Sequence, residues 1–279
     1  MEIPPAQIVQ TRHSLTLPWE EVWIMPISDV QCGVEACDEE RFRRHIKWGL
    51  EHGAYFIGGG DYVDMSNPSD RKRVRLADLN DTTTLALTEK AERDIELFKK
   101  LADGSQGRWL GFLQGHHYME FGDGTTSDTR IAEWAGAPFL GDSCLVDVVL
   151  QDKKRHLEST CTIFYRHGQG SSATEAAALN KLYKETATWD ADIYLHGHDH
   201  KKVATKKPRG SRVTGELHVR NTILAVTGSF MRGHMQGSRA GGRAGGTYVE
   251  KAGLPLVTLG GILLKLRPTK KGLDIDVEL

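Results

Sequence analysis

Short apolar runs recur along this chain, and each one ends at a glycine or a polar residue. Val22–Ile27 leads into a serine and an aspartate, and residues 54–57 lead into three glycines and another aspartate. Apolar runs of about four to eight residues between turn signals are typical of buried strands. On this basis we predict strands at residues 22–27, 54–57, 109–113, 145–150, 161–165, 193–195, 213–219, 222–226, 262–266 and 273–277.

Amphipathic helices are predicted between several of these strands. Asp38 is a suitable N-cap for the first helix, and Gly53 stands where that helix would end. Phe42, Ile46 and Leu50 repeat between them at helical spacing and form one apolar face. Further helices are predicted at residues 88–101, 127–134 (capped by its first residue) and 174–189. Helices and strands alternate first and strands dominate later, which predicts a mixed α/β sandwich.

Composition limits the class of protein. The 279 residues carry a formal net charge of -1, so no overall field attracts the chain to nucleic acid or to a membrane. The first five residues lack a signal-peptide pattern, and the best apolar stretch, residues 254–266, is too short to span a bilayer. The cysteines show no paired spacing, which favours reduced thiols. We therefore expect a cytoplasmic protein that does not enter membranes.

The chain is long enough for one large domain, and we predict a single domain over residues 1–279. Residues 65–84 and 231–247 lack clear periodicity and are predicted to be long loops. Long loops in a compact domain are often functional, so both are expected near the functional site.

A histidine cluster, His196-Gly197-His198-Asp199-His200, follows the predicted strand at 193–195. In extended backbone, side chains two positions apart point the same way, so His198 and His200 can converge on one point. Imidazole is the commonest protein ligand for transition metals. Taken alone, the cluster favours metal binding only slightly over a solvated histidine-rich loop, so its meaning depends on partners elsewhere in the chain.

Candidate partners follow other predicted strands. Polar side chains able to bind metal stand directly after five separate strand ends, and they are Asp29 with Gln31, Asp61 with Asp64, His116 with His117, His167, and His198 with His200. The carboxyl ends of strands are where an open α/β sheet offers a binding edge. Each residue alone could have an ordinary structural role, but the repetition predicts one shared metal site.

The order and types of these residues resemble the calcineurin-like metallophosphoesterase family. The family pattern is Asp-x-His, Gly-Asp, Gly-Asn-His-Asp/Glu, a lone His, and Gly-His-x-His. The corresponding segments here are Asp29-Val30-Gln31, Gly60-Asp61, Gly115-His116-His117-Tyr118, His167 and Gly197-His198-Asp199-His200. Two positions differ, because Gln31 replaces a ligand histidine and His116 replaces an asparagine. Residues 59–65 are also similar to phage and bacterial members of the family.

The resemblance implies a four-layer α/β/β/α sandwich of two mixed sheets and a centre with two divalent or transition metal ions. Asp61 would bridge the two ions. The first ion would also bind Asp29, Gln31 and His200, and the second would bind His116, His167 and His198. Manganese is favoured, with iron, zinc or nickel as alternatives. We expect Gln31 to weaken the first position and His116 to strengthen the second.

The implied activity is hydrolysis of phosphodiester bonds by a metal-activated hydroxide. His117 would stabilise the developing charge or protonate the leaving oxygen, and Asp64 or Glu120 would orient it. A phosphomonoesterase or protein phosphatase with the same site is one alternative. A non-catalytic, metal-containing protein that binds nucleic acid is another.

Basic residues suggest the substrate. They cluster at 71–75, at 201–212 and at Arg232, Arg239 and Arg243, in segments that we expect to be loops near the metal edge. Such charge suits a polyanionic substrate, so DNA, RNA or a nucleotide is the expected partner. The aromatic residues proposed to stack on bases are Tyr62, Tyr118, Phe121 and Trp134. The pattern makes no prediction of oligomeric state.

Overall fold

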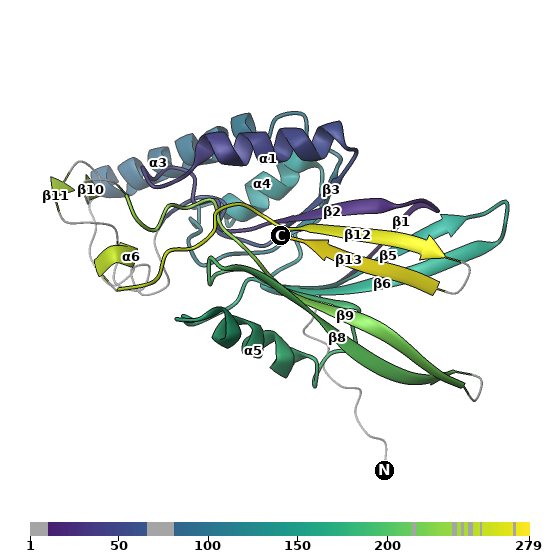
Figure 1. The fold of residues 1–279 in the computed structure, drawn as a ribbon. Coiled ribbons are helices and arrows are strands. Elements are labelled where there is room, and N and C mark those ends of the chain that lie inside the picture. Colours follow the sequence, from purple (N-terminus) through teal and green to yellow (C-terminus); the bar gives the residue numbers. More distant parts are fainter. Residues whose placement is uncertain are drawn as a thin grey trace, which may run out of the picture.

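The computed structural model describes residues 11–65, 81–213, 216–235, 239–240, 243–244, 248–251, 253–269 and 272–279. Within these residues, two large β-sheets lie face to face, and helices pack on both outer faces (Figure 1). The predicted α/β/β/α sandwich of two mixed sheets is therefore confirmed. That the whole chain forms one domain stays a prediction.

The first sheet has five strands in the order β13-β12-β2-β3-β4. β2, β3 and β4 are parallel, whereas β12 runs antiparallel to both β2 and β13. The strand bounds are Val22–Ile27 (β2), Tyr55–Gly58 (β3), Trp109–Phe112 (β4), Leu263–Thr269 (β12) and Gly272–Glu278 (β13). Its outer face is covered by α1 (Glu39–Glu51), α3 (Asp81–Leu101) and α4 (Ser127–Ala135).

The second sheet has six strands in the order β1-β5-β6-β7-β9-β8. Its strands are Thr11–Pro18 (β1), Ser143–Asp152 (β5), Leu157–Arg166 (β6), Ile193–His196 (β7), Lys202–Val213 (β8) and Glu216–Thr227 (β9). α5 (Glu175–Glu185) packs on its outer face. Smaller elements are β10 (Arg239–Ala240), β11 (Arg243–Ala244) and α6 (Tyr248–Lys251).

Alternation along the strands builds three apolar layers. In β2, Ile24 belongs to the layer between the two sheets, and its neighbour Met25 faces the helices. In β6, Ile163 likewise faces the first sheet, and Phe164 packs with α5. Successive strand residues point to opposite faces, so a strand between two packed layers must be apolar on both. This explains the unbroken apolar runs in the sequence.

The predicted helices are present, with corrected starts. Asp38 caps α1 as expected, because its side chain accepts a hydrogen bond from the backbone NH of Arg41. α4 is capped by Thr126 and not by Ser127, since the Thr126 hydroxyl accepts from the NH of Thr129. α3 begins at residue 81, so residues 81–84 of the predicted loop are helical. Threonines have weak helix propensity, which hid this start.

The largest correction concerns residues 202–213. The run of basic residues predicts a loop up to residue 212 and a strand only from residue 213, but Lys202–Val213 forms β8, which pairs with β9 along its whole length in an antiparallel hairpin. Basic residues interrupt the apolar alternation that identifies a strand, although Val203 and Ala204 still pack on opposite faces. β8 is an edge strand, where charged side chains oppose pairing with other chains.

One strand of the structure, β1, is not among the predicted elements, because its alternation of polar and apolar residues is short and mixed. In the part of the chain that the structure describes, no helix combines the length and the apolar character needed to cross a membrane. Cys32, Cys37, Cys144 and Cys161 are buried free thiols. The predicted loop at 65–84 falls mainly outside the described residues, whereas the predicted loop at 231–247 is described at 231–235, 239–240 and 243–244 and contains the paired strands β10 and β11.

Candidate metal centre

Five strands carry candidate ligands to one edge of the molecule. β2, β3 and β4 of the first sheet and β6 and β7 of the second all end within a few residues of the predicted metal ligands. The structure brings all seven of these side chains together, and they are Asp29, Gln31, Asp61, His116, His167, His198 and His200. They come from positions up to 171 apart in the sequence, from 29 to 200.

Three imidazoles form one group. His116, His167 and His198 each offer a ring nitrogen, and these nitrogens lie within 4.8 Å of one another. The Nδ1 atoms of His116 and His198 are 3.2 Å apart, and the rings meet edge to face. Three convergent imidazole nitrogens are a ligand set for a transition metal, which we call the nitrogen group.

Oxygen atoms dominate the neighbouring group. The carboxylates of Asp29 and Asp61 lie within 4.8 Å of the His167 ring nitrogen and of each other. His200 Nε2 is 3.3 Å from Asp29 Oδ1, and the Gln31 amide nitrogen is 3.3 Å from Asp61 Oδ2. We call Asp29, Gln31, Asp61 and His200 the oxygen group. Asp61 also lies 3.2 Å from His167, so it adjoins both groups.

The backbone is in the left-handed region at five of the seven positions. Asp29, Gln31, Asp61, His198 and His200 have φ between 54° and 63°. Among the described residues, His156 is the only other non-glycine residue with positive φ. Each such position costs about 1–3 kcal/mol and persists where the surroundings enforce it. Strain concentrated on candidate ligands indicates a functional site.

Glycines allow the ligand loops to approach closely. A Cβ atom on Gly115 would collide with the backbone nitrogen and the carboxylate of Asp61. Because that space is free, Asp61 Oδ1 accepts hydrogen bonds from the backbone NH groups of His116 at 2.5 Å and His117 at 2.9 Å. These bonds hold one oxygen of Asp61 in place and leave the other directed toward His167 and Gln31.

Several buried ligand atoms have no hydrogen-bond partner among the described residues. They are Gln31 Oε1, and also Asp29 Oδ1 and His167 Nε2, which have an ion-pair neighbour at 3.2–3.3 Å but no hydrogen bond. Buried polar atoms normally find partners, because leaving one unpaired costs about 1–3 kcal/mol. Here the unpaired atoms are carboxylate, amide and imidazole atoms that face one another, which is the arrangement that divalent cations satisfy. The residues present therefore fit metal binding.

The protonation states of the oxygen group suit cations. Burial opposes ionisation of Asp29, but the His200 imidazole outweighs burial and lowers the Asp29 pKa. Burial opposes ionisation of Asp61 in the same way, and His167 holds the Asp61 pKa well below its usual range. Both side chains are therefore carboxylates at neutral pH, the form that binds metal.

The imidazoles divide into two kinds. Burial and the neighbouring His167 lower the pKa of His116 to about 4, and they also lower the pKa of His198. Burial disfavours protonation of His167 too, but the Asp61 carboxylate outweighs it and raises the His167 pKa to about 10. His116 and His198 are neutral ligands at pH 7, whereas a metal that binds His167 has to displace a proton.

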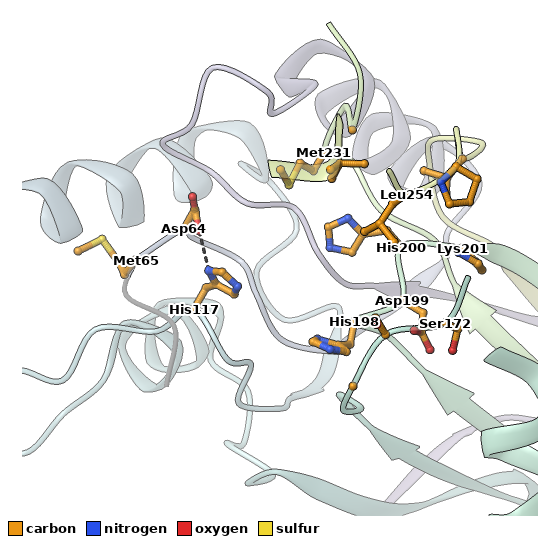
Figure 2. A pocket seen from close by; sticks show the side chains of 16 residues that line it. Asp64, Met65, His117, Ser172, His198, Asp199, His200, Lys201, Met231 and Leu254 are labelled. Atoms are coloured by element: carbon orange, nitrogen blue, oxygen red, sulfur yellow. Dashed lines mark ion pairs between the residues drawn. The ribbon is translucent and has the colours of Figure 1, made fainter. Parts of the chain in front are cut away.

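His117 and Asp64 stand beside this centre as a pair. His117 Nδ1 lies 2.7 Å from Asp64 Oδ1, and both side chains line a cavity of about 610 Å³ (Figure 2). Burial disfavours protonation of His117, but the hydrogen bond to Asp64 outweighs it and raises the His117 pKa. Glu120, the other candidate partner, instead accepts a hydrogen bond from Tyr118 at 3.3 Å. Asp64 is therefore the residue that orients His117.

The remaining residues of the histidine cluster have a structural role. His196 is buried, and its Nδ1 lies 3.5 Å from the Asp199 carboxylate. Asp199 also pairs with Lys181 of α5 at 2.8 Å. These contacts tie the segment between His198 and His200 to the helix below the second sheet.

Three supporting residues are absent from the sequence predictions. Ser229, which follows β9, donates from its hydroxyl to the Asp29 carbonyl at 2.9 Å, and Ser28 hydrogen-bonds the Asp29 carboxylate. Asp128 at the start of α4 accepts from the backbone NH of Gly115 at 2.9 Å. Ser28 directly precedes a predicted ligand, which is a usable signal. Ser229 and Asp128 act through contacts that the sequence pattern does not reveal.

Several basic residues that are predicted to bind substrate form ion pairs with carboxylates of this chain instead. Lys206 and Arg209 lie on β8 and pair with Asp276 and Asp190, so they are not in a loop at the metal edge. Arg232 pairs with Asp38 beside α1. Residues 71–75 lie outside the described residues, and the side chains of residues 239 and 243 are not described.

The aromatic residues proposed to stack on bases are mostly unavailable. Tyr62 is fully buried, and its hydroxyl donates to the Leu113 carbonyl at 2.9 Å. The guanidinium of Arg130 covers the ring of Phe121 at 3.5 Å from its centroid. Trp134 packs against the core between the helices and the first sheet. Tyr62, Phe121 and Trp134 therefore support the fold, which corrects the stacking role assigned to them.

No model of a known protein family matches this chain, and no curated protein is significantly similar to it. Solved structures with a similar arrangement include wild-type Vps29 complexed with zinc from Entamoeba histolytica, at 11% identity and a TM-score of 0.32 over 92% of this chain and 98% of that one. A predicted phosphoesterase from Streptococcus pneumoniae gives the same four values. The inner-membrane-complex anchor of Plasmodium has 10% identity and a TM-score of 0.42 over 92% and 84%. The fold description therefore depends on this chain's own strand order and core layers.

Proposed function

We propose that this chain is a metal-dependent phosphoesterase of the calcineurin-like metallophosphoesterase type, acting on phosphodiesters. One observation carries the proposal. Seven side chains from five strand ends converge with buried, unpaired ligand atoms, and five of them are held in left-handed backbone. Strain and unsatisfied polar atoms at one place are retained where they serve a function.

The proposed centre would hold two divalent ions, and Asp61 would contribute to both positions. His116, His167 and His198 would hold one ion, and Asp29, Gln31 and His200 would hold the other. When bound, such ions polarise the phosphoryl group and acidify the water that attacks phosphorus. Manganese is our first choice, because a mixed set of carboxylate, amide and imidazole ligands suits it. Iron, zinc and nickel are the alternatives.

The chain's own residues supply the remaining chemistry. His117 lines the cavity beside the ligands and is oriented by Asp64, so it would protonate the leaving oxygen as the ester bond breaks. Backbone NH groups of residues 116 and 117 hold Asp61 in place, which keeps the carboxylate available to both groups.

Beyond the proposed metal ions, the side-chain charge of the cavity favours a diester over a monoester. Among the described residues that line it, Lys201 is the only lysine or arginine. A phosphodiester carries one negative charge at neutral pH, whereas a monoester carries close to two, so the diester needs less compensation. A small nucleotide-type ester remains part of the proposal. An extended nucleic-acid strand loses support, because Lys206 and Arg209 of β8 are paired away from the centre.

Turnover of two model substrates tests this proposal. Manganese-loaded protein should hydrolyse bis(p-nitrophenyl) phosphate at least tenfold faster than p-nitrophenyl phosphate, a difference of about 1.4 kcal/mol in the barrier. A monoester preference would assign a phosphomonoesterase. Protein that binds metal but turns over neither substrate would be the non-catalytic alternative, and either result would overturn the proposed diesterase.

A further inference from the structure

The cavity beside the metal centre extends well beyond the candidate ligands. Its volume is about 610 Å³, within the range of about 300–1,000 Å³ typical of small-molecule sites. His117, His198 and His200 line one part of it (Figure 2). The rest is lined by residues with no role in metal binding, and three features of that part indicate what it binds.

The first feature is Lys201. Only 6% of this residue is exposed, yet no carboxylate in the described part of the chain forms an ion pair with its ammonium group. The nearby Asp199 is already paired with Lys181. Lys201 lines the cavity, so its ammonium group can pair there with an anionic group brought by a ligand.

Ser172 is the second feature. It is 5% exposed and lines the same cavity, and its hydroxyl has no hydrogen-bond partner among the described residues. Buried hydroxyls are normally hydrogen-bonded, because an unpaired one loses its bonds to water. Its position in the cavity lets a polar atom of a ligand supply the missing bond.

The third feature is an apolar wall formed by Met231, Leu254 and Val257. In Figure 2, Met231 and Leu254 lie on the opposite side of the cavity from Ser172. Methionine adapts its shape and packs favourably on aromatic rings, so this wall suits a flat apolar group. The cavity thus combines one cation, one free hydroxyl and one apolar surface.

We propose that this cavity binds the alcohol portion of a phosphodiester that carries both a flat apolar ring and a second anionic group. The anionic group pairs with Lys201, the ring packs on the apolar wall, and Ser172 donates a hydrogen bond to the ligand. The inference rests on the proposed function, since it places the ester phosphorus at the metal centre. It adds a specificity site that the metal ligands do not supply.

Binding of thymidine 3′,5′-bisphosphate and of inorganic phosphate to the manganese-loaded chain, measured by calorimetry, tests this site. The bisphosphate offers a ring and a second anion, so it should bind at least tenfold more tightly than inorganic phosphate. Lys201→Met should remove most of that preference and change phosphate binding less than twofold. Lys206→Met is the matched control, because Lys206 pairs with Asp276 on the hairpin, and it should change neither affinity.

Equal binding of the two ligands by the wild-type chain would overturn the inference, and this comparison needs no variant to fold. Equal effects of Lys201→Met and Lys206→Met would overturn it as well. A different outcome separates the two proposals. If inorganic phosphate does not bind but the bisphosphate does, and Lys201→Met abolishes that binding, the metal-centred function fails and the ligand site stands.

Discussion

The nitrogen group and the oxygen group of the candidate metal centre differ in both chemistry and origin. Asp29, Gln31 and Asp61 follow strands of the five-stranded sheet, whereas His167 and His198 follow strands of the six-stranded sheet. The centre therefore lies where the edges of two sheets meet. Each sheet contributes mainly one kind of ligand atom, and the packing of the sheets brings the two kinds together.

If each group holds one ion as proposed, the two metal positions should be unequal. Three imidazoles in the nitrogen group favour transition metals strongly, whereas carboxylate and amide oxygens bind harder ions and bind transition metals less tightly. We therefore expect one tight and one weaker position, joined by Asp61. Four predictions test this comparison, from the largest expected effect to the smallest.

Asp61→Asn should have the largest effect, because Asp61 adjoins both groups. We expect turnover of a diester to fall about a thousandfold, or about 4 kcal/mol, and at least one metal ion per chain to be lost. Elemental analysis and kinetics measure both. Asp276→Asn, on the distant hairpin contact, is the matched control. Full metal content and full turnover in Asp61→Asn would show that the two ligand groups do not share Asp61.

The second prediction concerns the free energy of unfolding of metal-free protein in acid, which does not depend on metal binding. His45 lies outside the centre, packed on Phe230, and burial lowers its pKa to about 4 from an ordinary value near 6.5. A histidine whose folded pKa is lowered stabilises the fold above its unfolded pKa, and that stability is lost as pH falls from about 6.5 to about 4. The contribution of His45 to this loss should be about 3 kcal/mol, measured by urea unfolding of metal-free protein.

The variant His45→Gln provides the control for this measurement. It cannot gain a proton, so it should lack the part of the decline that His45 contributes, while the part contributed by His116, whose pKa is also about 4, should remain in both proteins. If the wild-type chain and His45→Gln decline equally, the acid effect arises elsewhere, and the metal ligands become the first place to look.

His117→Ala should separate chemistry from metal binding. His117 contacts Asp64 and lines the cavity without belonging to either ligand group, so its loss should lower turnover about a hundredfold and leave the metal content unchanged. Asp64→Asn should have a smaller effect, about tenfold, since it acts by orienting His117. A metal-free His117→Ala protein would show instead that His117 is a ligand.

Gln31→His should have the smallest effect, and it tests the weaker metal position alone. An imidazole in place of the amide adds a nitrogen ligand to the oxygen group, so the weaker metal should bind about tenfold more tightly. Competition with a chelating dye measures this affinity. Gln151→His, on an exposed part of β5, is a matched control with no expected effect. An unchanged affinity in Gln31→His would remove Gln31 from the ligand set.

Much of this centre can be predicted from the sequence, because its ligands directly follow apolar runs. The runs that become β2, β3 and β7 are buried on both faces, so their ends and the following Asp29, Asp61 and His198 are visible in the pattern. β8 is not visible, because its basic residues hide the alternation. Ser229 cannot be predicted either, since it acts on Asp29 across 200 positions through packing of the two sheets.

Metal stoichiometry tests whether the two ligand groups form two unequal metal positions. Metal-free protein should be titrated with manganese by calorimetry, and the metal content should be confirmed by elemental analysis. The two unequal ligand groups predict two ions per chain, with dissociation constants at least tenfold apart. A chain that binds no metal, or that binds two ions with equal affinity, would contradict this account.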